Sequence, residues 1–145
     1  MKTKEEIAEL VLGYFDEGYA CSQSVLLGFA PYFNLDLEMA KRIASTFGGG
    51  MGRLRKTCGA ITGAYMVLGL KYGNTIPNDM ETKLNSYKKV RDLTSKFEEI
   101  NKTSDCGQIL KNYATNQEIK ERKHHKIICR KVIADVVDIL YDEIV

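Results

Sequence analysis

The sequence predicts an all-α protein, a single-domain bundle of six or seven helices with no sheet. Apolar residues recur at helical spacing in successive segments along the whole chain, which is the pattern of amphipathic helices. No segment alternates apolar and polar residues between turn signals, so no strand is expected. The length of 145 residues fits one domain over residues 1–145, and short connections favour packing of consecutive helices against each other.

The first two predicted helices are marked by their ends. Thr3 is a suitable N-cap, with Glu6 as its capping-box partner, and the apolar residues that follow form one stripe up to Gly18. The second helix should start around Cys21 and end near Pro31, since proline ends a helix readily.

The third predicted helix is capped by Asn34 or Asp36. Gly48 then supplies the left-handed residue that ends a helix at low cost. The glycine-rich segment 48–52 is a loop by composition. The face that we expect to be buried consists of Met39, Ala40, Ile43, Ala44 and Phe47.

A fourth helix is predicted from about Cys58 to Lys71, ended by Gly73. Asn78 or Asp79 can cap a long fifth helix. Apolar residues at roughly helical spacing on that helix predict a second buried face, made of Met80, Leu84, Tyr87, Leu93, Phe97 and Ile100.

The last two helices follow a Thr-Ser-Asp cap at residues 103–105 and a start near His125. The short sixth helix carries Cys106, Ile109 and Leu110 on its apolar side. The final helix has the most regular apolar stripe of the chain, formed by Val132, Ile133, Val136, Val137, Leu140 and Ile144.

Charge and hydropathy exclude several classes of partner. Lys and Arg number 21 and Asp and Glu 19, a net charge of +2, which lacks the basic stripe of a nucleic-acid binder. The longest weakly polar stretch, residues 59–70, is far shorter than the roughly 20 residues of a membrane span. Glutamates at positions 5, 6 and 9 interrupt the place of a secretory signal, so we expect a cytoplasmic protein that binds neither nucleic acid nor membrane.

Four cysteines carry the chemistry that the sequence offers, and no two of them form a C-x-x-C pair. Each is expected at or near a helix N-terminus, where free N–H groups and the helix dipole favour a thiolate and lower the cysteine pKa. Thiolates are redox nucleophiles and metal ligands, but buried free cysteines also serve as small apolar residues. The four are Cys21, Cys58, Cys106 and Cys129.

The segment FGGGMGRLRKTC-GAITGA combines a glycine loop, basic residues and a helix start. Glycines at 49, 50 and 52 permit close approach of the backbone to a bound group, and such a loop is a generic anion nest. No Walker A ending follows it, and a close helix–helix turn is the commoner explanation. Gly59 and Gly63 form a small-residue face that could accept a cofactor or a neighbouring helix.

One series of motifs runs along the chain in the order Cys21, GGGMGR, Cys58-Gly59-Ala60-x-x-Gly63-Ala64, Cys106 and Cys129. This series resembles the C_GCAxxG_C_C family of proteins described as redox-active. The family label spells glycine before cysteine, whereas Thr57 precedes Cys58 in this chain. The family's helical domain is similar to the N-terminal part of split-Soret cytochrome c. That similarity implies cysteine ligation of an iron–sulfur cluster. No C-x-x-C-H haem attachment site is present in the sequence.

Three hypotheses remain open from the sequence. The first is a redox or electron-transfer protein whose four cysteines ligate an iron–sulfur cluster, with Gly49, Gly50, Gly52, Gly59 and Gly63 around it. The second is a thiol–disulfide protein in which Cys58 attacks and Cys21 resolves. The third is a non-catalytic module with structural zinc at the four cysteines or with buried free thiols. The redox partner protein is not specified, and the small-residue face or the basic loop could serve a homodimer.

Overall fold

The computed structural model describes residues 1–114 and 122–145, with side chains for all of these except 122–124. Every regular element in this part of the chain is helical, which confirms the predicted all-α class. Seven helices have eight residues or more, and η1 and α4 are single turns. The elements are α1 (Lys4–Glu17), α2 (Cys21–Phe29), the 3-10 helix η1 (Ala30–Phe33), α3 (Leu37–Ser45), α4 (Gly48–Met51), α5 (Gly59–Tyr72), α6 (Met80–Asn101), α7 (Cys106–Tyr113) and α8 (Arg122–Ile144).

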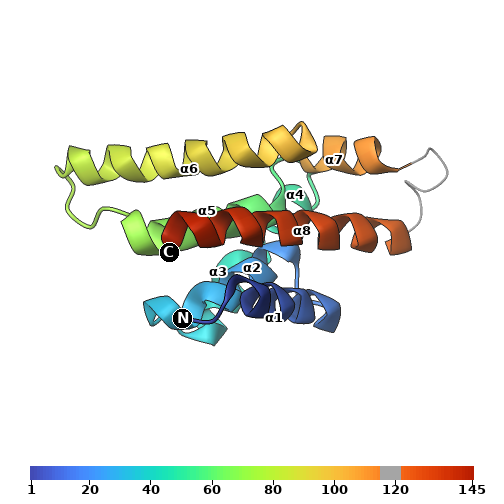
Figure 1. The fold of residues 1–145 in the computed structure, drawn as a ribbon, viewed down its shortest axis with the longest axis horizontal. Helices are drawn as coiled ribbons and strands as arrows, with labels where there is room; N and C mark the ends of the chain where they lie inside the picture. Colours follow the sequence, from blue (N-terminus) through green and yellow to red (C-terminus); the bar gives the residue numbers. More distant parts are fainter. Residues whose placement is uncertain (115–121) are drawn as a thin grey trace.

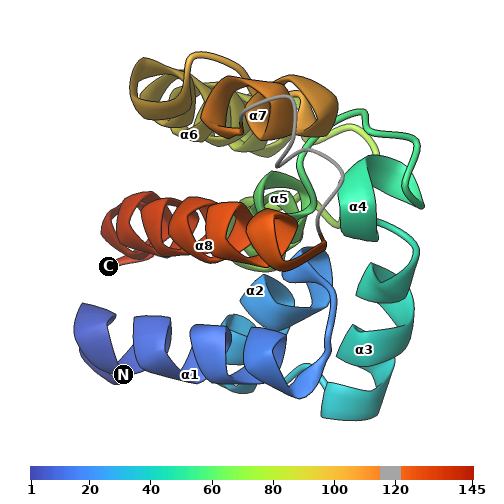
Figure 2. The same ribbon diagram turned by 90° about the vertical axis from the view of Figure 1, so that its right-hand side faces the viewer.

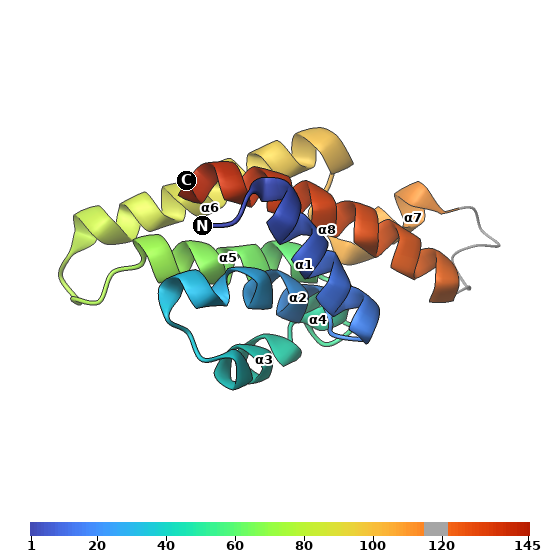
Figure 3. The ribbon, with the colours of Figure 1, turned by 60° about the horizontal axis from the view of Figure 1, so that its bottom comes forward.

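The helices are arranged in three layers (Figures 1 and 2). Helices α5 and α8 form the middle layer, with α6 and α7 on one side and α1 and α2 on the other, while α3 and α4 lie along one edge. Helix α5 packs against α2, α6 and α8, and α1 packs against α2 and α8. The two chain ends lie close together, as Figure 3 shows from below.

Side-chain caps set the predicted helix starts. The Thr3 hydroxyl accepts from the Glu6 N–H at 3.1 Å, and the Glu6 carboxylate accepts from the Thr3 N–H at 3.0 Å, so the capping box is confirmed. Gly18 ends α1 with a φ of 111°. Aspartates 36, 79 and 105 accept N–H groups at the starts of α3, α6 and α7.

The core lies where α5 and α8 meet their neighbours. All six apolar residues predicted for the final helix are buried. Helix α5 is buried around most of its circumference, because it carries small residues that let three helices approach it. Its buried apolar residues are Ala60, Ile61, Ala64, Val67 and Leu68.

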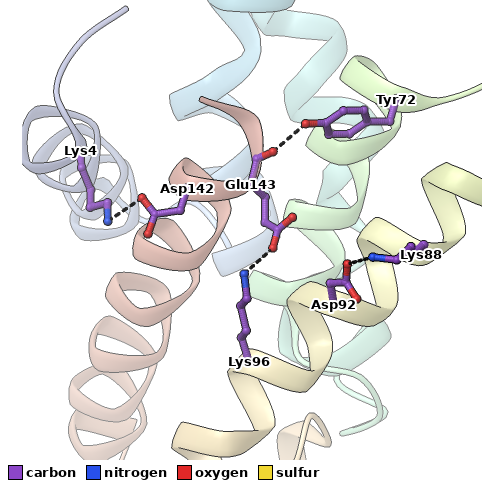
Figure 4. A network of polar contacts seen from close by, with 7 residues as sticks. All are labelled: Lys4, Tyr72, Lys88, Asp92, Lys96, Asp142 and Glu143. Carbon is purple, nitrogen blue, oxygen red and sulfur yellow. Dashed lines mark hydrogen bonds and ion pairs between the residues drawn. The ribbon is translucent and has the colours of Figure 1, made fainter.

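The last turn of α8 is tied to three other helices by polar contacts (Figure 4). Lys96 of α6 lies 2.8 Å from the Glu143 carboxylate, and the Tyr72 hydroxyl of α5 donates to the Glu143 carbonyl at 2.6 Å. Lys4 at the start of α1 forms ion pairs with Asp138 and Asp142, both at 2.9 Å. These contacts hold the end of the bundle that is farther from α4 and α7.

The predicted buried face of α3 was only half correct. Ala40 and Ala44 are fully buried, but Met39 is 51% and Ile43 47% exposed. The alanines allow α3 to lie close to α2, which rotates the larger residues toward solvent. The prediction that Gly48 ends this helix was also wrong, because α3 ends at Ser45 and the left-handed glycines come later.

The predicted face of α6 was wrong at four positions. Leu93 and Phe97 are buried. The side of the helix on which they lie continues toward the helix start through the half-buried Val90 and Ser86. The remaining apolar residues lie off this stripe and are about half exposed. They are Met80, Leu84, Tyr87 and Ile100.

Within the described ranges, no helix is both long enough and apolar enough to cross a membrane.

Candidate cysteine site

Three of the four cysteines lie at helix starts, as the sequence predicted. Cys21 is the first residue of α2, Cys58 is the N-cap of α5, and Cys106 is the first residue of α7. The prediction was wrong for Cys129, because α8 already begins at Arg122 and Cys129 lies about two turns inside it. Its sulfur therefore faces no unpaired N–H group of its own helix.

All four cysteines line one pocket of about 980 Å³, although they come from four different helices. They are unpaired thiols. Among the side chains that the structure describes, no three His, Cys, Asp or Glu residues are arranged to hold a single metal ion. Apolar residues of α7 and α8 complete the wall of the pocket, among them Ile109, Leu110, Ile128 and Val132.

A short stretch of extended backbone joins two of the cysteines, and no pattern in the sequence predicted it. The Cys58 N–H donates to the Ser104 carbonyl at 2.8 Å, and the Cys106 N–H donates to the Lys56 carbonyl at 2.6 Å. Thr57 and Asp105 form the bridge between these bonds. The pairing fixes the starts of α5 and α7 relative to each other, 48 positions apart in the sequence.

The loop before Cys58 has an unusual run of left-handed backbone. Gly49 and Gly50 have φ values of 66° and 73°, but Met51, Arg53 and Arg55 also lie near 60–67°. A non-glycine residue in this region costs about 1–2 kcal/mol. The bonds from the Arg55 and Lys56 N–H groups to the Gly49 and Gly50 carbonyls hold the loop. Backbone strain of this kind is typical of functional sites.

The glycines predicted around a cofactor fall into two groups. Gly49, Gly52 and Gly59 line the pocket, whereas Gly50 and Gly63 are not among its lining residues. A Cβ on Gly59 would lie 2.4 Å from the Cys21 sulfur, so Gly59 makes room for that thiol.

Gly50 and Gly63 make room for other parts of the chain. A Cβ on Gly50 would lie 2.6 Å from the Cys106 Cβ, and one on Gly63 would lie 2.7 Å from the Ser22 carbonyl oxygen. Gly63 therefore permits close packing of α2 on α5, which is the structural explanation that the sequence had left open.

Burial dominates the acid–base behaviour of the thiols. It raises the pKa of Cys58 strongly and that of Cys21 as well, although backbone N–H groups of Ala60 and Gly49 oppose the rise. Burial also raises the pKa of Cys129 to about 12, and the charge of Arg55 opposes this rise. The predicted lowering of the pKa by helix N-termini was therefore wrong for these thiols, because loss of hydration outweighs the helix dipole.

Arg55 stands out in the sequence only as one of the basic residues after the glycine loop, and its contact with a cysteine was not predicted. Its Nη1 donates to the Cys106 sulfur at 3.7 Å, and it lines the pocket together with Arg53, His125 and Lys126. The signal available in the sequence was the basic run that follows the glycine loop. Arg55 brings a permanent positive charge within hydrogen-bond reach of a sulfur of the pocket.

Comparison with known proteins places the chain in a family. Residues 19–143 match the family model described as "Putative redox-active protein (C_GCAxxG_C_C)". The chain belongs to this family, so the resemblance seen in the sequence is confirmed. It is also 26% identical over 139 residues to an uncharacterised protein of Archaeoglobus fulgidus, a match that covers 91% of this chain and 92% of that one. No solved structure matches the chain.

Proposed function

We propose that this protein is an electron carrier that binds an iron–sulfur cluster through Cys21, Cys58, Cys106 and Cys129. The observation that carries the proposal is the meeting of all four cysteines, from four separate helices, in one pocket. Four thiolates are the ligand set of the common iron–sulfur clusters. When bound, such a cluster would supply one-electron transfer.

The pocket offers four sulfurs from four helices. The ligands of a cluster bind different iron atoms, so a cluster takes sulfurs that are distributed around it. Glycine at position 59 leaves the Cys21 sulfur space beside the start of α5. The chain also provides a hydrogen bond to sulfur, from Arg55 to Cys106. Bonds of this type tune the potential of a bound cluster.

Burial favours the protonated thiols of Cys21, Cys58 and Cys129 when no metal is bound, and this property affects both loading and the main alternative. Metal binding must displace the thiol protons, so loading should release protons and improve as the pH rises. The alternative is thiol–disulfide exchange with Cys58 as nucleophile. The raised pKa of Cys58 counts against it, because the thiolate is the attacking species.

The test is purification without oxygen, followed by assays for iron and acid-labile sulfide per chain. We expect a brown protein that contains both, and substitution of any one of the four cysteines by serine should reduce both. Ser24→Ala is the matched control, since Ser24 is buried on α2 without lining the pocket.

The other possible outcomes reject the proposal or support an alternative function. A colourless protein after anaerobic reconstitution with iron and sulfide would reject the proposal. One tightly held zinc per chain would support a structural metal site instead. Loss of two or four titratable thiols on mild oxidation, without metal, would support thiol–disulfide exchange.

A further inference from the structure

The cysteine pocket is also lined by positively charged side chains. Apart from the thiols and the Tyr19 phenol, its ionisable lining residues are Arg53, Arg55, His125 and Lys126. None of the described residues that line it is an aspartate or a glutamate. A concave site lined by charge of one sign focuses the electrostatic field and concentrates ligands of the opposite sign.

The two arginines meet over the glycine loop. A Cβ at Gly49 would lie 2.7 Å from the Arg53 Cγ and 3.8 Å from the Arg55 Nη1. Both arginines have left-handed backbone, with φ values of 64° and 59°. The chain therefore accepts conformational strain at the two residues whose side chains share this place beside the cysteines.

Among the described residues, no carboxylate is paired with the arginines or the lysine of the pocket. Across residues 1–114 and 122–145, Arg53, Arg55 and Lys126 take part in no ion pair, whereas other lysines and arginines of the chain do. Arg55 does contact the Cys106 sulfur, but a guanidinium has five N–H donors and one such contact leaves most of them available.

We propose that this pocket binds a small ligand bearing an oxyanion, held by Arg53, Arg55 and Lys126 beside the cysteines. Arginine matches the geometry of carboxylates, phosphates and sulfur oxyanions because its N–H groups can bind two oxygens at once. A volume of about 980 Å³ is at the upper end of the range for small-molecule sites. Binding itself does not depend on the proposed cluster, whereas a role for the ligand as an electron-transfer substrate would rest on it.

The test uses the reduced, metal-free chain and the iron-loaded chain, labelled with ¹⁵N and titrated with sodium sulfate or sodium malonate. Sodium chloride keeps the ionic strength constant. We expect saturable amide shifts at Gly49 and Gly52, since both line the pocket. Sulfate and malonate distinguish a tetrahedral oxyanion from a carboxylate.

Arg53→Gln and Arg55→Gln should each weaken binding about tenfold, because each removes a charge-assisted hydrogen bond. Arg91→Gln is the matched control, since Arg91 is exposed on α6 and does not line the pocket; its affinity should be unchanged. Retention of amide dispersion in each variant shows that it is folded.

Four results would overturn the proposal. The first is the absence of amide shifts with either anion, and the second is shifts that do not saturate. The third is equal weakening in the control and the pocket variants. The fourth is binding of polyglutamate but of neither small anion, which would indicate a protein partner. Anion binding by a chain that takes up no iron would leave this proposal standing while the cluster proposal fails. A brown, iron-containing chain that ignores both anions would do the reverse.

Discussion

The close contact of α2 and α5 can be tested by adding a single methyl group. Gly63 and Gly69 both lie on α5, but their surroundings differ. A Cβ at position 63 would lie 2.7 Å from the Ser22 carbonyl oxygen and 3.2 Å from the Val25 Cβ, whereas one at position 69 meets nothing within 4 Å. Because Ser22 follows Cys21 directly, any shift of α2 would also move a cysteine of the site.

The two alanine variants should change stability in opposite directions. Alanine in place of a helical glycine gains up to about 1 kcal/mol from helix propensity, and Gly69→Ala should show most of this gain. In Gly63→Ala the new methyl group contacts backbone atoms, which cannot move away as a flexible side chain can, and overpacking costs about 1–3 kcal/mol. The gain offsets part of this cost, so we expect a net loss of up to about 2 kcal/mol at position 63, or up to roughly 6 °C in Tm.

Urea and thermal unfolding followed by circular dichroism measure this difference. Both variants change the same residue type on one helix, so the comparison isolates the contact with α2. If Gly63→Ala proves as stable as Gly69→Ala, the two helices are not packed as closely as the structure shows, and the argument for the role of Gly63 fails.

Three further perturbations have defined outcomes. Gly59→Ala places a methyl group on the Cys21 sulfur and should lower iron uptake, while normal uptake would show that the sulfur has room to move. Asn101→Ala removes three hydrogen bonds of a buried amide and should lower the free energy of unfolding in urea by about 2–3 kcal/mol. The control Asn85→Ala, on the exposed side of the same helix, should leave this free energy nearly unchanged. The capping box lowers the pKa of Glu6 in the folded chain. The ionised Glu6 therefore stabilises the fold above the ordinary glutamate pKa, and this stabilisation is lost as the pH falls through the pKa of Glu6 in the folded chain. Glu6→Gln should therefore lose less stability than the native chain between neutral and acid pH, and parallel curves would contradict the linkage.

Helix ends could be predicted from the sequence because their signals are local. Thr3 with Glu6, and Asp105 before Cys106, satisfy N–H groups only a few residues away. The buried faces of α3 and α6 depended instead on which residues meet neighbouring helices. Leu93 and Phe97 set the rotation of α6, and nothing within that segment ranks them above Leu84.

The lining of the pocket was predictable from the sequence only in part. The four cysteines and three of the five glycines named from the sequence line it, while their role as ligands stays a prediction. The pairing of Cys58 with Ser104 and the contact of Arg55 with Cys106 join segments about 50 positions apart, and no local pattern encodes them. The direction of the thiol pKa shifts depends on burial, which follows from the packing of four helices.

Native mass spectrometry of the chain purified without oxygen tests the central claim most directly. The account predicts one species heavier than the polypeptide by an iron–sulfur cluster, and the loss of that added mass when all four cysteines are replaced by serine. A native mass equal to that of the bare polypeptide, after reconstitution with iron and sulfide, would contradict it.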